Sequence, residues 1–170
     1  MSELLIGCGN SRRKKFSMDG PDWVSLVTMD HDPNCGADIV HDLDQTPWPV
    51  ESDRFDSVHA YEVLEHLGAQ GDWRAFFLHF GEIYRVLKPG GHLIATVPSW
   101  KSQWAWADPS HTRIIAPGTL SFLSQRQYKE QIGKTAMTDF RHIWSGDFEP
   151  VHVECGDEVF VFVLEAIKPR

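Results

Sequence analysis

The sequence predicts an α/β protein in which a mostly parallel β-sheet carries helices on both faces. Short apolar runs that end in a polar residue alternate with stretches of helical periodicity, which is the pattern of strand–helix–strand units. The stretch WRAFFLHFGEIYRVL (73–87) has an apolar stripe at helical spacing, and KPGG (88–91) follows it as a stop signal. Two β-rich runs around a short polar turn near the C-terminal end predict an antiparallel hairpin.

Each predicted strand is a short segment rich in apolar residues. In chain order the expected strands are 4–6, 24–30, 37–42, 54–61, 92–98, 150–155 and 159–167. The stretch between Asn10 and Trp23 leaves room for only a short helix, because a parallel crossover usually takes about a dozen residues or more. We therefore expect a truncated first helix. Several strands end in polar residues at the carboxyl edge of the sheet, where open α/β sheets bind ligands.

Length and composition indicate one globular domain over residues 1–170. The formal net charge of −8 argues against general nucleic-acid binding, which normally needs a basic face. The short basic segment SRRKK (11–15) is either a solvated edge or a phosphate contact. Cys8, Cys35 and Cys155 form no C-x-x-C pair, so we expect free thiols in a reducing compartment. The apolar run LLI is too short for a signal peptide or a membrane span, and we expect a cytoplasmic protein.

A glycine loop follows the first predicted strand. IGCGN (6–10) supplies a G-x-G, but Arg12 stands where the dinucleotide fingerprint has its third glycine, which disfavours an NAD-binding hypothesis. Asp30 ends the second strand, 21 residues after Gly9, where a carboxylate can accept both ribose hydroxyls. Asp42 ends the third strand and can accept from an adenine amino group. Either aspartate alone is equally well a cap or turn residue, but with the glycine loop they indicate an adenosine-bearing ligand.

Four motifs follow one another along the chain: LLIGCGN, VTMDHD, ADIVHDLDQTPWPVESDRFDSVHAYEVLEHL and IYRVLKPGGHLIATVPS. In this order they resemble the class I S-adenosylmethionine-dependent methyltransferases of the small type 11 kind. The resemblance spans residues 4–98, and DPSHTR (108–113) resembles a segment after the fifth strand of one compact subgroup. It implies a Rossmann-like seven-stranded sheet with an antiparallel last strand, and S-adenosylmethionine as cofactor. The sequence departs from the family at Leu5, where an acid is frequent, and at Ser11, where a third loop glycine usually stands.

The resemblance implies cofactor-binding residues at the ends of the first four strands. They are Gly7, Cys8, Gly9 and Asn10 in the first loop, Asp30 and His31 after the second strand, Asp42 and Leu43 after the third, and His59, Ala60 and Tyr61 at the end of the fourth. In the family, the first loop approaches the cofactor closely, the second group holds the ribose and packs beside the adenine, the third contacts the adenine, and the fourth lines the methionine end.

Two carboxylates and an imidazole follow the fourth strand in AYEVLEHL (60–67). If a helix begins here, Glu62, Glu65 and His66 share one face, which is a solvated surface, a proton-handling site or a metal site. With His111 the set resembles the Mg-dependent residues of small-RNA 2′-O-methyltransferases and ubiquinone-pathway O-methyltransferases, and two imidazoles favour Mn²⁺ or Co²⁺. We rank a metal-free site higher, in which His66 or His111 is the general base for an acceptor hydroxyl.

Three tryptophans, at positions 100, 104 and 106, follow the fifth predicted strand. They either pack in the core or at the sheet edge, or form a wall or lid of an acceptor pocket. Aromatic walls suit a flat or apolar acceptor or the face of a sugar.

The leading hypothesis is an enzyme that transfers a methyl group from S-adenosylmethionine to an oxygen of a small molecule or sugar. A nucleic-acid substrate is disfavoured, because AYEV replaces the D/N-P-P-Y/F motif of amino-methylating DNA enzymes and no Pro-Cys pair is present. A second hypothesis is a non-catalytic protein that binds the adenosyl cofactor or serves as a partner subunit, and a third is an NAD-dependent oxidoreductase. Little is inserted between the strands, which predicts an open acceptor site or one closed by a second subunit in a homo-oligomer.

Overall fold

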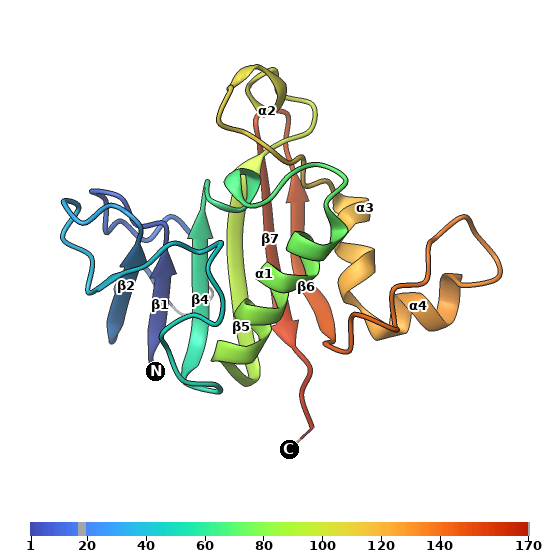
Figure 1. The fold of residues 1–170 in the computed structure, drawn as a ribbon, viewed down its shortest axis with the longest axis horizontal. Helices are drawn as coiled ribbons and strands as arrows, with labels where there is room; N and C mark the ends of the chain where they lie inside the picture. Colours follow the sequence, from blue (N-terminus) through green and yellow to red (C-terminus); the bar gives the residue numbers. More distant parts are fainter. Residues whose placement is uncertain (17–19, 170) are drawn as a thin grey trace.

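A seven-stranded sheet forms the centre of the computed structural model, which describes residues 1–16 and 20–169 (Figure 1). The strands are β1 (Glu3–Ile6), β2 (Leu26–Asp30), β3 (Ile39–Val40), β4 (Phe55–Tyr61), β5 (Leu87–Pro98), β6 (Phe148–Cys155) and β7 (Val159–Ala166). They lie in the order β3-β2-β1-β4-β5-β7-β6. Strands β1 to β5 pair in parallel, and β7 is antiparallel to both β5 and β6. The mostly parallel sheet with a C-terminal antiparallel hairpin is thus confirmed.

The helical elements are η1 (Leu64–His66), α1 (Trp73–Val86), α2 (Trp104–Ala107), α3 (Pro117–Leu120), η2 (Ser121–Leu123) and α4 (Gln125–Gln131). Helix α1 begins after Asp72, whose side chain accepts a hydrogen bond from the amide of Ala75 at 3.1 Å. Its apolar stripe, including Phe76, Phe80 and Ile83, is buried in the main core as the periodicity predicts. None of the helices in the described chain is long and apolar enough to cross a membrane.

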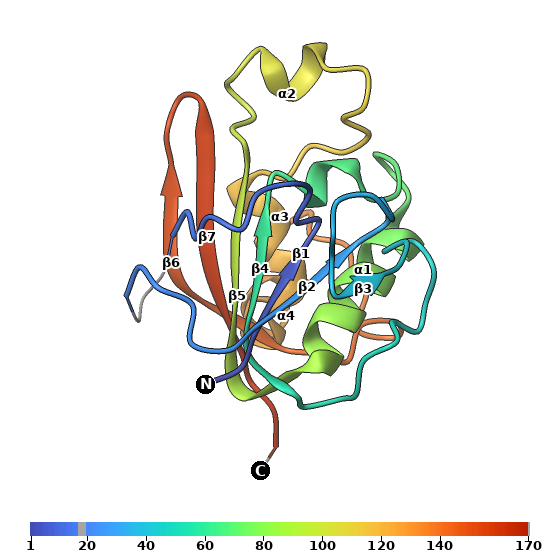
Figure 2. The ribbon, with the colours of Figure 1, turned by 90° about the vertical axis from the view of Figure 1, so that its left-hand side faces the viewer.

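The two faces of the sheet are covered differently. Apolar residues of α1, α3, η2 and α4 pack with the β-strand side chains of one face in the main core. Leu5, Ile94 and Val163 lie on the other face, where Phe16 and Trp23 of the loop between β1 and β2 pack against their cluster. Figure 2 shows α1 on one side of the strands and this loop on the other.

Two details of the predicted fold, the truncated first helix and a helix on this second face, are not found among residues 1–16 and 20–169. The described residues between β1 and β2 (7–16 and 20–25) contain only turns, bends and extended chain. The ammonium of Lys14 reaches under this loop to the carboxylate of Glu3 at 2.7 Å, and both side chains are at most 2% exposed. The indole Nε1 of Trp23 donates to the carbonyl of Arg12 at 2.6 Å. The basic segment thus anchors the loop that replaces the helix.

Strand β3 is shorter than the sequence predicts. Asp38, just before it, bonds to β2 through its side chain instead of extending the strand. Its carboxylate accepts hydrogen bonds from the amide and the hydroxyl of Thr28 in β2, at 2.8 and 2.7 Å. These bonds lower the pKa of Asp38. They also fix the chain before β3, so that the turn after Val40 lies at the carboxyl edge of the sheet.

Candidate active site

A cavity of about 490 Å³ lies at the carboxyl edge of the sheet. It is lined by Gly7, Gly9, Asp30, His31, Asp32, Asp42, Leu43, Glu62, Val63, His66, Leu67 and Ser110. The residues follow the strand order along this edge, because Asp42 comes after β3, Asp30 ends β2, and Glu62 follows β4. The structure therefore brings together six of the cofactor-binding residues that the sequence predicts.

The two glycines of the first loop have different tasks. Gly7 has φ +58°, and a Cβ atom there would lie 2.4 Å from Cγ2 of Val63, so this glycine allows the loop to pack against the segment after β4. Gly9 has φ +48° and open space where a Cβ atom would be, next to the cavity. In place of a third glycine, the guanidinium of Arg12 donates to the carbonyl oxygen of Gly9 at 2.7 Å and to that of Cys35 at 3.0 Å.

Asp30 holds the wall of the cavity together and is 6% exposed. One carboxylate oxygen accepts from the amide of Gly9 at 2.8 Å, and the other from the amide of Asp32 at 2.9 Å. Each oxygen of a carboxylate has more than one lone pair, so both remain able to accept ligand hydroxyls. The imidazole of His31, with its side chain 82% exposed, lies beside this carboxylate.

The polar and apolar side chains of the cavity wall fit an adenosine moiety. Asp30, Asp32 and Asp42 present acceptors for hydroxyl and amino hydrogens, and Leu43 and Leu67 supply apolar surface. No lysine or arginine occurs among the described residues of the wall. With Glu62 the wall carries four carboxylates, which would repel the two phosphates of a dinucleotide, and this counts against the NAD hypothesis.

Five of the predicted cofactor residues do not line the cavity: Cys8, Asn10, His59, Ala60 and Tyr61. The strand alternation explains β4, because Ala60 points into the main core while His59 and Tyr61 point toward the β1–β2 loop. The thiol of Cys8 is buried beside that of Cys35, and burial raises its pKa to about 11. Cys8, Asn10 and Tyr61 still adjoin a lining residue in the chain, whereas His59 and Ala60 do not.

His59 belongs to a buried polar network rather than to the cavity wall. Its ring donates through Nδ1 to the hydroxyl of Tyr61 at 2.7 Å, because that hydroxyl itself donates to the carbonyl of Phe16 at 2.7 Å. Its Nε2 then accepts from Ser57 Oγ at 2.9 Å and lies 3.5 Å from a carboxylate oxygen of Glu3. Burial lowers the pKa of His59 to about 4, so the imidazole is neutral at pH 7.

Sequence reasoning missed four residues of the wall: Asp32, Val63, Leu67 and Ser110. Asp32 lies in the motif VTMDHD, so the same motif that indicated Asp30 and His31 could have indicated it. The sequence could not indicate Ser110, because this residue comes from the segment after β5 and meets the cavity only through folding.

The segment after β4 does not form the helix that would place Glu62, Glu65 and His66 on one face. Glu62 has φ +59°, a left-handed conformation that is uncommon for a residue with a side chain. Only one 3₁₀ turn, η1, follows it. Glu62 faces the cavity, whereas Glu65 is turned inward and is 2% exposed.

Three titratable groups meet at the rim of the cavity. Glu65, His66 and His111 each offer a ligand atom, and these atoms lie within 4.8 Å of one another. The rings of His66 and His111 have centroids 4.8 Å apart. Burial raises the pKa of Glu65 to about 8. Of the four metal-ligand candidates in the sequence, the structure thus gathers three, and Glu62 lies outside the group.

The three tryptophans after β5 are exposed, by 46% at Trp100, 60% at Trp104 and 68% at Trp106. Packing in the core is therefore excluded for them. Their segment, with α2, extends beyond the carboxyl end of β5 in both ribbon views (Figures 1 and 2). It is joined to the rim of the cavity because Nδ1 of His111 contacts the carbonyl of Trp104 at 2.9 Å.

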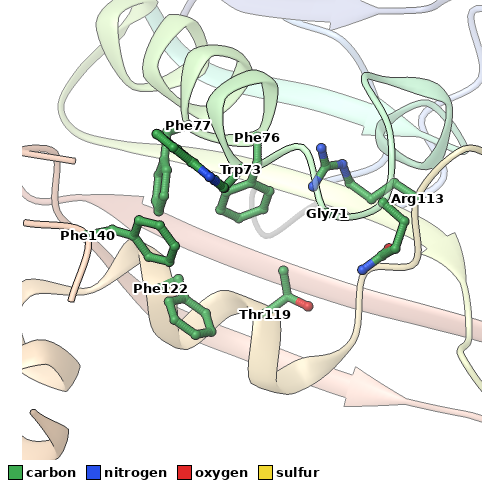
Figure 3. A pocket seen from close by; sticks show the side chains of 9 residues that line it. Gly71, Trp73, Phe76, Phe77, Arg113, Thr119, Phe122 and Phe140 are labelled. Atoms are coloured by element: carbon green, nitrogen blue, oxygen red, sulfur yellow. The ribbon is translucent and has the colours of Figure 1, made fainter. Parts of the chain in front are cut away.

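A second hollow, of about 360 Å³, lies beside α1 and shares no residue with this cavity. Its wall is largely aromatic, with Trp73, Phe76, Phe77, Phe122 and Phe140 (Figure 3). Its one charged side chain is Arg113, whose guanidinium donates to backbone carbonyls of the α1 entry. This hollow offers no free proton-transfer group, so the chemistry is assigned to the cavity at the sheet edge.

Comparison with known proteins agrees with this site. The sequence model of a family described as "Methyltransferase domain" matches residues 6–135. None of the curated proteins compared with the chain matched it significantly.

Solved structures resemble the whole chain at low sequence identity. The N-methyltransferase NodS from Bradyrhizobium japonicum WM9, in complex with S-adenosyl-L-homocysteine, has a TM-score of 0.57 and 15% identity over 98% of this chain and 78% of that one. A SAM-dependent methyltransferase from Archaeoglobus fulgidus has a TM-score of 0.57 and 14% identity over 96% of this chain and 85% of that one. The 1,6-didemethyltoxoflavin-N1-methyltransferase of Burkholderia thailandensis has a TM-score of 0.55 and 14% identity over 98% of this chain and 71% of that one.

These neighbours establish the fold, and the matched family model covers well over half of the chain. The match includes the glycine loop, the acidic strand ends, η1 and the segment that carries His111. The chain belongs to the methyltransferase family that this domain defines.

Proposed function

We propose that this protein transfers the methyl group of S-adenosylmethionine to an oxygen atom of a small molecule or sugar. S-adenosylmethionine, the cofactor of the enzyme, supplies a methyl group that is already activated by a sulfonium. The protein has to bind it, align the acceptor and handle one proton. The observation that carries the choice of acceptor atom is the pair His66 and His111 at the rim of the cavity.

The cofactor would be held by the residues of the cavity wall. We assign its ribose to Asp30, its adenine to Asp42 and Leu43 with His31 beside it, and its approach to the loop at Gly7 and Gly9. Cys8 and Asn10 would contribute through the loop, and His59, Ala60 and Tyr61 by fixing the end of β4.

The imidazole pair favours oxygen over nitrogen as the acceptor. A hydroxyl has to lose its proton to become a good nucleophile, whereas an amine is nucleophilic as soon as it is neutral. Imidazole titrates near neutrality and suits proton uptake. Both named neighbours with a stated reaction methylate nitrogen, but identities of 14–15% carry the fold and not the acceptor.

The test combines cofactor binding with product analysis. We expect titration calorimetry to show micromolar binding of S-adenosylhomocysteine, and labelled S-adenosylmethionine to methylate members of a panel of phenols, catechols and sugars. The variants His66→Gln and His111→Gln should keep this binding and lose about 10²-fold or more in turnover. The matched control is His142→Gln, because His142 is exposed and lies outside the site.

Three results would contradict the proposal. Methylation of amines alone would show that the acceptor atom is nitrogen. Binding of S-adenosylhomocysteine without product from any acceptor would favour the non-catalytic or partner-subunit hypothesis. Absence of binding would remove the cofactor assignment itself.

A further inference from the structure

We propose that the aromatic hollow beside α1 is a second binding site, which takes a small aromatic molecule that carries a carboxylate. The hollow measures about 360 Å³ and shares no residue with the cavity at the sheet edge. Its volume lies in the range of small-molecule sites, about 300–1,000 Å³. Neither the cofactor nor the methyl acceptor of the proposed function would occupy this hollow, so the two sites can be tested separately.

The hollow contains a buried cation without an anion. Arg113 is 8% exposed, and it forms no ion pair with a carboxylate in the described part of the chain. Its guanidinium donates instead to three backbone carbonyls, through Nε to Leu67 at 3.2 Å and through Nη2 to Ala69 and Asp72 at 2.9 and 2.8 Å. Buried charges are normally paired with an opposite charge, because their removal from water is costly.

Asp72 is the nearest candidate for the missing anion, but its carboxylate has another task. It accepts from the amide of Ala75 at 3.1 Å and so begins helix α1. Its charge raises the pKa of Arg113, but burial has the larger effect, so the pKa is lowered. The guanidinium still keeps its proton at neutral pH. The wall of the hollow therefore carries a positive charge that a ligand can neutralise.

The guanidinium also has donors left over. It carries five N–H groups, one on Nε and two on each terminal nitrogen. The three bonds to carbonyls use the hydrogens of Nε and Nη2, and Nη1 donates to none of the residues that the structure describes. A carboxylate is a strong partner for Nη1, because a charge-assisted hydrogen bond is stronger than a neutral one.

The other polar side chains of the wall are donors as well. Oε1 of Gln70 accepts from the amide of Ile114 at 2.9 Å, which leaves the hydrogens of the side-chain nitrogen for a ligand. Oγ1 of Thr119 accepts from the amide of Ala116 at 3.1 Å, so its hydroxyl hydrogen points elsewhere. The described wall contains no aspartate or glutamate. Its polar part thus favours an anion over a cation.

The apolar part of the wall favours a flat ring. Phe77, Phe122 and Phe140 lie at one end of the hollow and Arg113 at the other, with Phe76 between them (Figure 3). The ring centroids of Phe77 and Phe122 lie 5.2 and 5.9 Å from that of Phe140. Aromatic side chains pack favourably against another ring, stacked or edge-on. A molecule with a ring at one end and a carboxylate at the other matches both ends of the hollow.

A purely structural role of Arg113 is the alternative explanation. The guanidinium fixes the entry of α1 and lies over the ring of Phe76, 5.3 Å from its centroid. In that case the charge of a ligand would not matter, and a neutral molecule of the same shape would bind equally well. Comparison of a carboxylate with its neutral analogue therefore separates the two explanations.

The experiment is calorimetric titration of the full chain with 2-naphthylacetate. The matched ligands are 2-naphthylacetamide, which has the same ring system without the charge, and 2-(2-naphthyl)ethylamine, which is a cation. We expect one equivalent of the carboxylate to bind, at least about 10-fold more tightly than the amide, and the amine to bind more weakly still. Saturating S-adenosylhomocysteine should leave the stoichiometry for the carboxylate at one.

The variant Gln70→Glu reverses the electrostatic preference with little change in shape. Residue 70 is exposed, and a glutamate can still accept from the amide of Ile114 while it brings a negative charge into the same wall as Arg113. We expect the affinity for 2-naphthylacetate to fall by at least about 10-fold, and the preference for the amine to rise. Gln103→Glu is the control, because it makes the same change of charge at an exposed position outside the hollow.

Several results would overturn the second site. They are absence of binding, equal affinity for the carboxylate and the amide, unchanged affinity in Gln70→Glu, and displacement of the probe by S-adenosylhomocysteine, which would place it in the cavity at the sheet edge. Thermal melting shows whether Gln70→Glu is folded, and the comparison of ligands on the wild type holds in either case. If S-adenosylhomocysteine binds and 2-naphthylacetate does not, the second site fails and the proposed function stands; the reverse result contradicts only the proposed function.

Discussion

Asp30 and His59 show how single side chains in this protein already have structural partners before any ligand arrives. Asp30 bonds two backbone amides of the cavity wall, and His59 bonds Ser57 and Tyr61 beneath the β1–β2 loop. A substitution at either site therefore tests structure and function together, and its control has to separate the two.

The first prediction concerns Asp30→Asn. The amide keeps one acceptor but loses the charge and an acceptor for the ribose, so we expect affinity for S-adenosylhomocysteine to fall about 10- to 100-fold. Titration calorimetry measures it, and the urea midpoint reports whether the fold is kept. Asp157→Asn is the control, since that side chain is 92% exposed. Unchanged affinity in Asp30→Asn would show that the ribose is held elsewhere.

The second prediction is a pH dependence of stability. Burial lowers the pKa of His59 to about 4, below its value of about 6.5 in the unfolded chain. The unfolded state thus takes up a proton first as the pH falls, so stability should decrease between about pH 6.5 and 4 and level off below that. His79, whose pKa is also lowered by burial, contributes with the same sign.

Urea denaturation from pH 4 to 7 measures this dependence. In His59→Gln the slope of unfolding free energy against pH should be smaller than in the wild type, and in His142→Gln it should be unchanged. Equal slopes in all three proteins would mean that Glu3, Lys14 and Tyr61, which surround the imidazole, hold its pKa near the ordinary value.

Among the elements of the fold, the loop between β1 and β2 is the most unusual. It covers a sheet face that we expected a helix to cover. Burial pushes the pKa of Glu3 upward, but the Lys14 ammonium and the amide of Val24 offset this and leave it below the ordinary value. The ion pair thus holds the loop on the sheet, with Phe16 and Trp23 as its apolar contacts.

Removal of one partner of this pair should therefore be costly. We expect Lys14→Ala to lower the unfolding free energy by about 3 kcal/mol, because it leaves the buried carboxylate of Glu3 unpaired. Urea denaturation followed by tryptophan fluorescence measures the change. Arg13→Ala, one residue earlier and exposed, should change it by less than about 0.5 kcal/mol. A small effect of Lys14→Ala would mean that water reaches Glu3 and that apolar contacts alone hold the loop.

At the level of the whole molecule, the cavity is built from the ends of four strands and from the segment after β5. A ligand there should stabilise the complete fold rather than one element. At a concentration 100 times its Kd, a ligand of the native state adds about 2.7 kcal/mol. For a chain of this size we expect S-adenosylhomocysteine to raise the melting temperature by about 5–10 °C.

Differential scanning fluorimetry measures this shift. NAD⁺ at equal concentration is the matched control, and Asp30→Asn should reduce the effect of S-adenosylhomocysteine. A larger shift with NAD⁺ would show that the four carboxylates of the cavity wall do not exclude a dinucleotide.

The sequence by itself determined most of the sheet and half of the residues that line the cavity at its carboxyl edge. Strand positions, helix α1 and the C-terminal hairpin follow from local periodicity and turn residues, which act over a few neighbours. Gly7, Gly9, Asp30 and Asp42 were found because parallel strands bring their carboxyl ends to one edge. Each of these inferences needs only the spacing of residues along the chain.

Only the tertiary structure decided the rest. The described part of the loop between β1 and β2 lies on the sheet face because Lys14 pairs with Glu3 of β1. A local sequence pattern does not reveal this contact between distant residues. His59 and Tyr61 turn from the cavity because the register of β4 aims them at the loop. Glu65 and His66 meet His111 because the carbonyl of Glu65 binds the segment after β5. Contacts between distant parts of the chain depend on how the elements pack, so the chemistry of the rim emerges only in the folded protein.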